Sequence, residues 1–299
     1  IRNLDMRDIK NKLTSSKNTK NIQRRKGKSF GYQVLGFGSG GTPFTGMTAT
    51  GGSITTVGDF KVHTFTSPGT FEVTEAGSDD EANSVQYLII GGGGGMGYGY
   101  GGAGGAGGYR AAGCGPAPLQ ASNAPTPVTS YPIVVGAGGA GSPIRPVGPF
   151  VPATAGNPSS GISLTGAGGG YGAAHPNTGV NGGPGGSGGG GGGGAPPRGT
   201  GGTGNSPPVS PPQGNPGESG PAPEGNQGGG AGAAGASPRA GVTGVTNSID
   251  GTPKKYACGG RSGEGTPAVI SPRANSGFGG TCQGVAGCSG IVIIKYRIA

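Results

Sequence analysis

Val85-Gln86-Tyr87-Leu88-Ile89-Ile90 and the C-terminal segment Ile291-Val292-Ile293-Ile294-Lys295-Tyr296-Arg297-Ile298 flank a tract that holds most of the glycine in this chain. Both segments are short and rich in β-branched and aromatic residues, as buried strands are. Of the 77 glycines, 65 lie between Gly91 and Gly290. The simplest arrangement pairs the two segments in one sheet, so that the glycine tract leaves the sheet after the first strand and returns before the second.

The composition limits how such a tract can be held in place. Glycine and proline together make up 104 of 299 residues (77 and 27), and only 30% of the chain is apolar. Ordering each residue costs roughly 1–2 kcal/mol, which so few apolar side chains cannot offset in one conventional core. An ordered tract of this kind must therefore be held by backbone hydrogen bonds.

Polyglycine II is a structure of that kind. It shares the three-residue repeat of polyproline II, which has no internal hydrogen bonds, so its N–H and C=O groups point sideways to neighbouring helices. Glycine at the contact positions allows the close approach that this pairing needs. A collagen helix is rejected, because the Gly-X-Y register fails at Pro197 and again at Pro223.

The sequence before the tract predicts further strands at Ile54–Val57, Phe60–Thr66 and Thr70–Thr74. Between the last two, Ser67-Pro68-Gly69 is typical of a hairpin turn in which glycine has a positive φ. We therefore expect a mainly β fold, with a small sandwich-like frame of strands near 54–90 closed by 290–298. The expected divisions are a basic arm (1–29), a docking or lead-in segment (30–47), the β-frame (48–90 and 286–299) and the glycine-rich insertion (91–285).

Three apolar islands interrupt the glycine tract, and we expect them to return to the sheet as strands. They are Pro132–Val135, Ile162–Leu164 and Ala268–Ile270. The stretch from Gly166 to Gly241 has no such island, which makes it the predicted site of the polyglycine bundle or of a projecting lobe.

The net charge of +9 is concentrated at the N-terminus. Residues 1–30 hold ten Lys or Arg and two Asp, which is +8, and the other 269 residues hold eleven basic and ten acidic side chains, which is +1. Such an arm could bind phosphates, but it lacks the interleaved aromatic residues of a single-strand groove, so docking onto an acidic protein surface explains it without nucleic acid. The expected docking residues are Arg24, Arg25, Lys26, Lys28, Phe30, Tyr32 and Phe37.

No motif in the chain predicts catalysis, a cofactor, a metal or a membrane span. Gly-x-Gly-x-x-Gly runs are expected by chance in so much glycine, and no acidic residue follows a helix in the spacing of a dinucleotide site. The two histidines are His63, which we expect on a strand, and His175, which we expect in a loop, and neither needs a metal to explain it. The acidic run Asp79-Asp80-Glu81 is more simply explained as a solvated turn than as a cation site. No run of 18 apolar residues exists.

Four cysteines are present, at 114, 258, 282 and 288. Cys282 and Cys288 are close enough to bridge a turn, and such a disulfide would indicate an extracellular or virion-surface protein. Buried free thiols are the alternative.

An ordered series of motifs resembles the glycine-rich domain of bacteriophage tail-fibre and adhesin proteins, of the marine-phage type, over about residues 48–299. The series begins with His63-Thr64-Phe65-Thr66-Ser67-Pro68-Gly69-Thr70-Phe71-Glu72-Val73 and with Val85–Ile90 running into Gly91–Gly95. It continues through Gly105–Arg110 and Val135–Gly139 to Gly290–Tyr296. The resemblance implies a virion structural protein, often at a receptor-binding tip, and not an enzyme.

Tyrosines flanked by glycine are the candidate receptor-binding residues, because each ring has little neighbouring side chain to shield it. An exposed tyrosine offers an apolar face with a polar handle, which suits a sugar or protein receptor. The alternative is that these rings pack across the bundle and seal its faces. The residues are Tyr98, Tyr100, Tyr109 and Tyr171.

We therefore expect a virion surface protein, at a tail-fibre tip or as a receptor-binding adhesin. It would bind other virion proteins of the tail or capsid through its arm and a host surface glycan or protein through its glycine-rich part, as a homo-oligomer. A capsid decoration or cement protein anchored by the arm is one alternative. A secreted filament or matrix subunit is the other.

Overall fold

A computed structural model of the chain divides it into two units, Ile1–Pro43 and Phe44–Ala299. The residues that the structure describes are 43–143, 152–174, 179–194, 196–220, 225–236, 243–262, 274–281 and 285–299. The basic arm and its docking residues therefore lie outside the described residues. So do His175, the island Ala268–Ile270 and Cys282.

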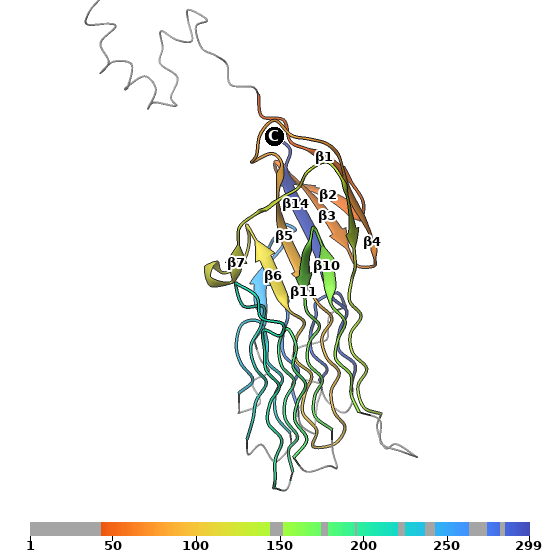
Figure 1. Ribbon diagram of the computed structural model, residues 1–299, viewed down its shortest axis with the longest axis vertical. Helices are drawn as coiled ribbons and strands as arrows, with labels where there is room; N and C mark the ends of the chain where they lie inside the picture. Colours follow the sequence, from red (N-terminus) through yellow and green to blue (C-terminus); the bar gives the residue numbers. More distant parts are fainter. Residues whose placement is uncertain are drawn as a thin grey trace, which may run out of the picture. The chain divides into compact units, whose positions relative to one another are not determined.

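The larger unit is built on a seven-stranded sheet, in the order β2-β3-β14-β5-β6-β7 with the short β8 (Ala124–Pro125) paired to β5 (Figure 1). The strands are β2 (Ser53–Val57), β3 (Phe60–Phe65), β5 (Ser84–Ile90), β6 (Tyr109–Ala112), β7 (Gln120–Ala121) and β14 (Ile291–Arg297). A 3₁₀ turn, η1 (Ala117–Leu119), precedes β7.

The C-terminal strand β14 lies in the middle of this sheet. Ile293 is paired with Leu88 of β5 on one side and with Thr64 of β3 on the other, and both pairings are antiparallel. Side chains on both faces of β14 are buried, which explains why its sequence is nearly continuously apolar instead of alternating. The predicted pairing of the 85–90 and 291–298 segments is confirmed.

A three-stranded sheet covers one face of the larger sheet and makes a sandwich. Its order is β1-β4-β9, with β1 at Thr48–Thr50, β4 at Gly69–Glu75 and β9 at Ser130–Ile133. Phe71 and Ile133 of this sheet share one apolar core with Tyr87 and Val292 of the larger sheet. The chain is mainly β, as its sequence predicts. The apolar island at 132–135 contributes to β9 of the smaller sheet.

The predicted hairpin at Ser67-Pro68-Gly69 is wrong. β3 belongs to the larger sheet and β4 to the smaller one, so the turn carries the chain from one layer of the sandwich to the other. Gly69 is the first residue of β4 and is not among the glycines with a positive φ. Proline at 68 still ends β3, but a turn sequence does not determine whether the next strand stays in the same sheet.

The opposite face of the larger sheet is covered by a hairpin that the sequence did not reveal. β12 (Val245–Asn247) pairs antiparallel with β13 (Lys254–Tyr256). Val245, Tyr256 and the intervening Ile249 form a second apolar core with Leu88 and Ile293 of the sheet. A further small hairpin, β10 (Ser159–Gly161) with β11 (Leu164–Gly166), turns at 162–163, so the island at Ile162–Leu164 is mainly a turn.

Beyond the sheets, the glycine segments run side by side as extended chains (Figure 1) and are joined by backbone hydrogen bonds. In residues 91–97, consecutive N–H groups donate to three different neighbouring segments, and every third residue donates to the same segment. Gly91, Gly94 and Gly97 donate to 108, 105 and 102; Gly92 and Gly95 donate to 157 and 154; Gly93 and Met96 donate to 288 and 285. This three-residue repeat is that of a polyglycine II helix.

Among the described segments of the bundle, three helices are enclosed, at residues 91–97, 102–108 and 187–193, and we call them the inner helices. In each, N–H groups donate to three neighbouring segments and carbonyls accept from three others. For 187–193 the neighbours that accept are 100–106, 180–183 and 215–218, and those that donate are 170–173, 199–202 and 226–229. A helix with neighbours in all directions has little room for side chains, and these are among the most glycine-rich runs in the chain. The large side chain of Met96 is the exception, and it is fully buried.

Contact between the helices depends on the missing Cβ. A Cβ built on Gly190 would overlap the carbonyl oxygen of Asn226, and one on Gly94 would overlap that of Gly170. The bundle also extends further than the predicted 166–241, because 91–108 and 136–143 belong to it. Strands β6 to β13 lie within the 91–285 insertion, so the insertion builds part of the sandwich as well as the bundle.

The larger unit has two distinct ends (Figure 1). The first described residues and the C-terminus meet at one end of the sandwich, where a Cβ on Gly46 would overlap the carbonyl oxygen of Arg297. The glycine helices leave the sheets at the other end. We call the end where the termini meet the terminal end. We call the far end of the glycine helices the tip.

Candidate functional site

The turn between two inner helices lies at the tip and carries two of the candidate tyrosines. The N–H of Gly101 donates to the carbonyl of Tyr98 at 3.0 Å, which closes a four-residue turn. Gly99 has a φ of 64°, a conformation that a side chain would strain. The sequence Tyr-Gly-Tyr therefore places two aromatic rings on a turn that its glycine makes tight.

Neighbouring helices fix this turn in position. The N–H of Gly193 donates to the carbonyl of Tyr100 at 2.9 Å, and the backbone of Gly225 packs directly against the carbonyls of Tyr100 and Gly101. The Tyr100 residue is 41% exposed and Tyr98 is half-buried. Recognition residues are favourable on a rigid backbone, because little conformational entropy is then lost on binding.

Tyr171 is 37% exposed but does not lie with these two. Its carbonyl accepts from Gly183 at 2.8 Å, and the next residue, Gly172, donates to Gly95, which is part-way along an inner helix. A Cβ on Gly183 would overlap the Tyr171 ring, so the ring packs on that neighbour. Tyr171 therefore belongs to the side of the bundle.

The expectation that Tyr109 is a surface residue is wrong. It begins β6, is 1% exposed, and its hydroxyl accepts a hydrogen bond from the Asn247 amide at 2.8 Å. Burial raises the pKa of Tyr109 to about 12. Tyr109 is buried because the β12–β13 hairpin covers this face of the sheet.

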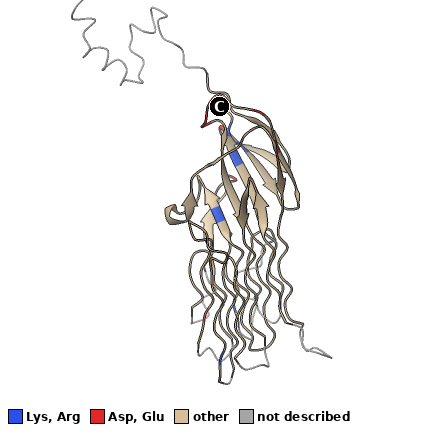
Figure 2. Ribbon diagram, in the orientation of Figure 1, with Lys and Arg blue, Asp and Glu red and all other residues tan. Residues whose placement is uncertain are grey.

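Charge is scarce in the bundle (Figure 2). Within its described segments, the charged residues are Arg198, Glu218 and Arg261. The carboxylate of Glu218 accepts the N–H of Gln227 at 2.9 Å and is nearly buried. Arg198 is exposed, and its guanidinium donates to the carbonyl of Gly194, next to the Gly193 that bonds Tyr100. This end therefore offers aromatic faces, hydroxyls and backbone groups together with the cationic Arg198.

A family model described as a glycine-rich domain matches residues 66–297. The chain belongs to the glycine-rich domain family. No curated protein matches it. The matched range begins at the end of β3 and runs through β14, so it includes the bundle together with most of the sandwich of this glycine-rich domain protein.

His63 has a structural place in the domain. It is fully buried, its Nδ1–H donates to the carbonyl of Gly51 at 2.7 Å, and its Nε2 accepts from the Tyr296 hydroxyl at 3.3 Å. Its ring also meets the edge of Phe71 at 5.1 Å between centroids. Burial lowers the pKa of His63, so the neutral ring is the folded form.

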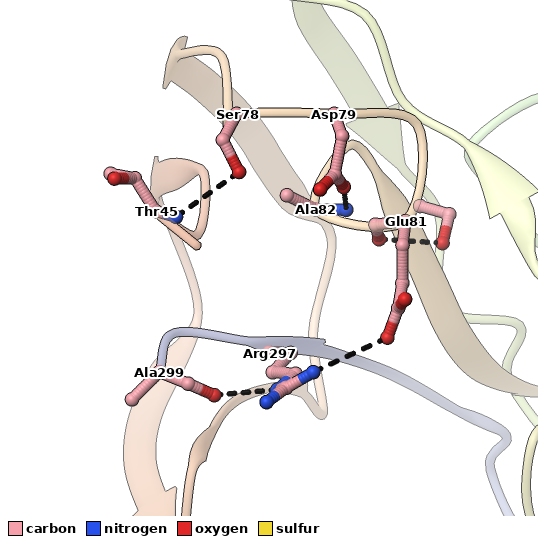
Figure 3. Close-up of polar contacts among 8 residues, drawn as sticks. Thr45, Ser78, Asp79, Glu81, Ala82, Arg297 and Ala299 are labelled. Carbon is pink, nitrogen blue, oxygen red and sulfur yellow. Dashed lines mark hydrogen bonds and ion pairs between the residues drawn. The ribbon is translucent and has the colours of Figure 1, made fainter. Parts of the chain in front are cut away.

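The acidic run before β5 builds a turn at the terminal end (Figure 3). Asp79 accepts the N–H of Ala82 at 2.9 Å, and Glu81 lies 3.4 Å from the guanidinium of Arg297. Among the described residues no cluster of three or more His, Cys, Asp or Glu side chains is placed to hold a metal ion.

At the same end, residues near the start of the described chain contact the C-terminal strand and the acidic turn. The guanidinium of Arg297 lies over the ring of Phe44, 4.4 Å from its centroid, and the N–H of Thr45 donates to the Ser78 hydroxyl at 3.1 Å (Figure 3). Residues 44–47 of the expected docking segment are therefore part of the sandwich, with Met47 in its core.

The cysteines of the described chain are free thiols. Cys288 is free, and Cys282, the other cysteine of the disulfide considered, lies outside the described residues. Cys114 and Cys258 are free as well, and burial raises the pKa of Cys258 and of Cys288. The part of the chain that the structure describes contains no helix with the length and hydrophobicity of a membrane span.

Proposed function

We propose that this glycine-rich domain protein is a structural protein of a virion surface that binds host cells through the tip of its bundle. The observation that carries the proposal is the separation of the two ends. The termini of the domain meet at one end. The turn with Tyr98 and Tyr100 joins the inner helix that follows β5 to the inner helix that precedes β6, so it lies toward the other end. A domain attached at its terminal end would present the tip outward.

The resemblance of its motif series to tail-fibre and adhesin proteins supports the same assignment, with the basic arm as the part that attaches to other virion proteins. A rigid lattice of backbone hydrogen bonds suits a binding tip, because it holds the turn without needing a large apolar core. The ligand class that fits the tip is a host surface glycan or a protein patch, which tyrosine can stack against and hydrogen-bond.

Binding, and not catalysis, is the activity that we propose. In the described chain both nitrogens of His63 are occupied inside the core, and the acidic turn is satisfied by its own backbone and by Arg297. Neither group is arranged as an acid–base or nucleophile–base pair facing a cleft.

The test uses particles that carry the double variant Tyr98→Ala/Tyr100→Ala. We expect assembly to be intact and adsorption to host cells to fall at least tenfold, which corresponds to about 1.4 kcal/mol of binding free energy. Tyr171→Ala is the matched control, because it removes an equally exposed ring from the side of the bundle. It should adsorb as the wild type does.

Measuring host adsorption and head stability of particles that lack the whole protein distinguishes the adhesin role from the decoration role. Normal adsorption by such particles would overturn the adhesin proposal. Normal adsorption combined with unstable heads would instead favour capsid decoration. Copy number gives an independent measurement, since a fibre tip is present in far fewer copies per particle than a decoration protein.

A further inference from the structure

Among the described residues, strand β2 forms one edge of the seven-stranded sheet and has no strand paired on its outer side. Its hydrogen-bonded neighbour in the described chain is β3, and residues 53–56 are exposed. The opposite end of the sheet is formed by the two-residue β7. Natural sheets usually protect such an edge with charge, proline or a bulge, because it is a template for another strand.

The sequence of β2, Ser-Ile-Thr-Thr-Val, contains none of these protections. Four of its five residues are β-branched, none is charged, and Ile54 is 47% exposed. An edge of this composition favours strand addition, in which main-chain hydrogen bonds supply most of the recognition.

The pairing with β3 determines which groups of β2 face outward. Val57 and Phe60 flank a two-residue turn. Going back along β2 from Val57, the alternate residues are Thr55 and Ser53. Residues flanking such a turn exchange their hydrogen bonds with each other, so the N–H and C=O groups of 53, 55 and 57 point to β3. Those of Ile54 and Thr56 point away from the sheet.

We propose that this edge pairs with β2 of a second copy, antiparallel about a twofold axis at Thr55. In that register Ile54 lies opposite Thr56 of the second copy and exchanges both backbone hydrogen bonds with it. Ser53 lies opposite Val57 of the second copy, and the two Thr55 side chains face each other. All five residues of β2 are then paired.

The charge pattern favours a second copy as the occupant. No charged side chain stands on β2, so the twofold register brings no like charges together, which would otherwise be destabilising. The flanking Gly58 of one copy comes opposite Gly52 of the other, and neither residue carries a side chain that could clash. Two seven-stranded sheets become one continuous sheet, and the pairing closes after two copies instead of growing into a filament.

The experiment measures the mass of the full chain in solution by light scattering, over a concentration series and under reducing conditions. The chain mass is 28.4 kDa, and we expect the wild type to show twice that value. Thr55→Lys and Thr55→Asp each place like charges face to face across the twofold axis, so each alone should have half the mass of the wild type. An equal mixture of the two should regain the wild-type mass.

Two further variants separate the edge from general effects. Thr56→Pro removes an outward N–H while leaving the bonds to β3 in place, and it should also halve the mass. Thr70→Lys, on the central strand β4, adds the same charge at another exposed threonine and should keep the wild-type mass. Circular dichroism checks that each variant is folded.

The proposal is overturned if the wild type has the single-chain mass at every concentration. It is also overturned if folded Thr55→Lys and Thr56→Pro keep the wild-type mass. These outcomes are independent of host adsorption, so failure here and failure of the proposed tip function are distinguishable.

Discussion

At the scale of single residues, the bundle depends on atoms that glycine lacks. Gly190→Val should lower the thermal unfolding midpoint strongly, because its Cβ would overlap the carbonyl of Asn226 and push an inner helix away from its neighbours. Each buried N–H left without an acceptor costs about 1–3 kcal/mol. Thr203→Val is the control, since it changes an exposed side chain on an adjoining segment. Equal midpoints for the two variants would mean that the lattice contributes little to stability.

A second prediction at this scale concerns pH. His63 has a lowered pKa in the folded protein, so below the unfolded value of about 6.5 the unfolded chain takes up a proton that the folded chain does not. The stability supplied by neutral His63 is therefore complete above that pH and is lost as the pH falls. His63→Phe should remove this part of the pH dependence, measured as the difference in unfolding free energy between pH 7 and pH 5. An unchanged slope would contradict it.

The tyrosines show how far single residues can be read from sequence. A glycine on each side of a tyrosine predicts a ring without local shielding, and this is what Tyr100 shows. Tyr109 has a glycine on one side only, at the point where the chain re-enters the sheet as β6. Its burial is caused by the β12–β13 hairpin, which is more than a hundred residues away in sequence. A pattern of neighbouring residues cannot predict such a contact.

At the scale of elements, β5 and β14 could be predicted because both faces of each are buried, which requires a run of apolar residues. The β12–β13 hairpin could not, since each strand has three residues and Lys254 and Lys255 make one of them polar. Its burial of Val245 and Tyr256 depends on the sheet that it covers. The extent of the bundle was underestimated for a related reason: short segments such as 136–143 become helices of the lattice only when neighbours are present.

Strand β14 is the element whose loss should be most severe. Deleting Ile291–Ala299 removes the partner of both β3 and β5 and exposes two apolar strand edges. We expect the truncated chain to be found in the insoluble fraction on expression. Deleting Ala299 alone leaves β14 intact and should give soluble protein. A soluble, cooperatively unfolding truncation would show that the sheet forms without its central strand.

At the scale of the whole molecule, the proposed attachment through the charged first 30 residues can be tested separately from the proposed recognition at the tip. Deleting residues 1–28 removes the whole +8 of this segment and should prevent incorporation into particles while leaving the domain folded. Attachment of the wild-type protein should weaken as salt rises, because exposed charges more than roughly 8 Å apart are screened at physiological ionic strength. Incorporation of the deleted protein at wild-type level would assign attachment to another surface.

The backbone lattice of the bundle has a consequence for how the protein responds to temperature. Exposing apolar surface raises the heat capacity of unfolding by about 0.45 cal/mol/K per Å², whereas exposing polar surface lowers it by about 0.26. The glycine helices bury mainly peptide groups, so this protein should have a smaller heat-capacity change per residue than an ordinary domain. Its stability curve is then flatter, and the bundle keeps its shape in cold water as well as in warm.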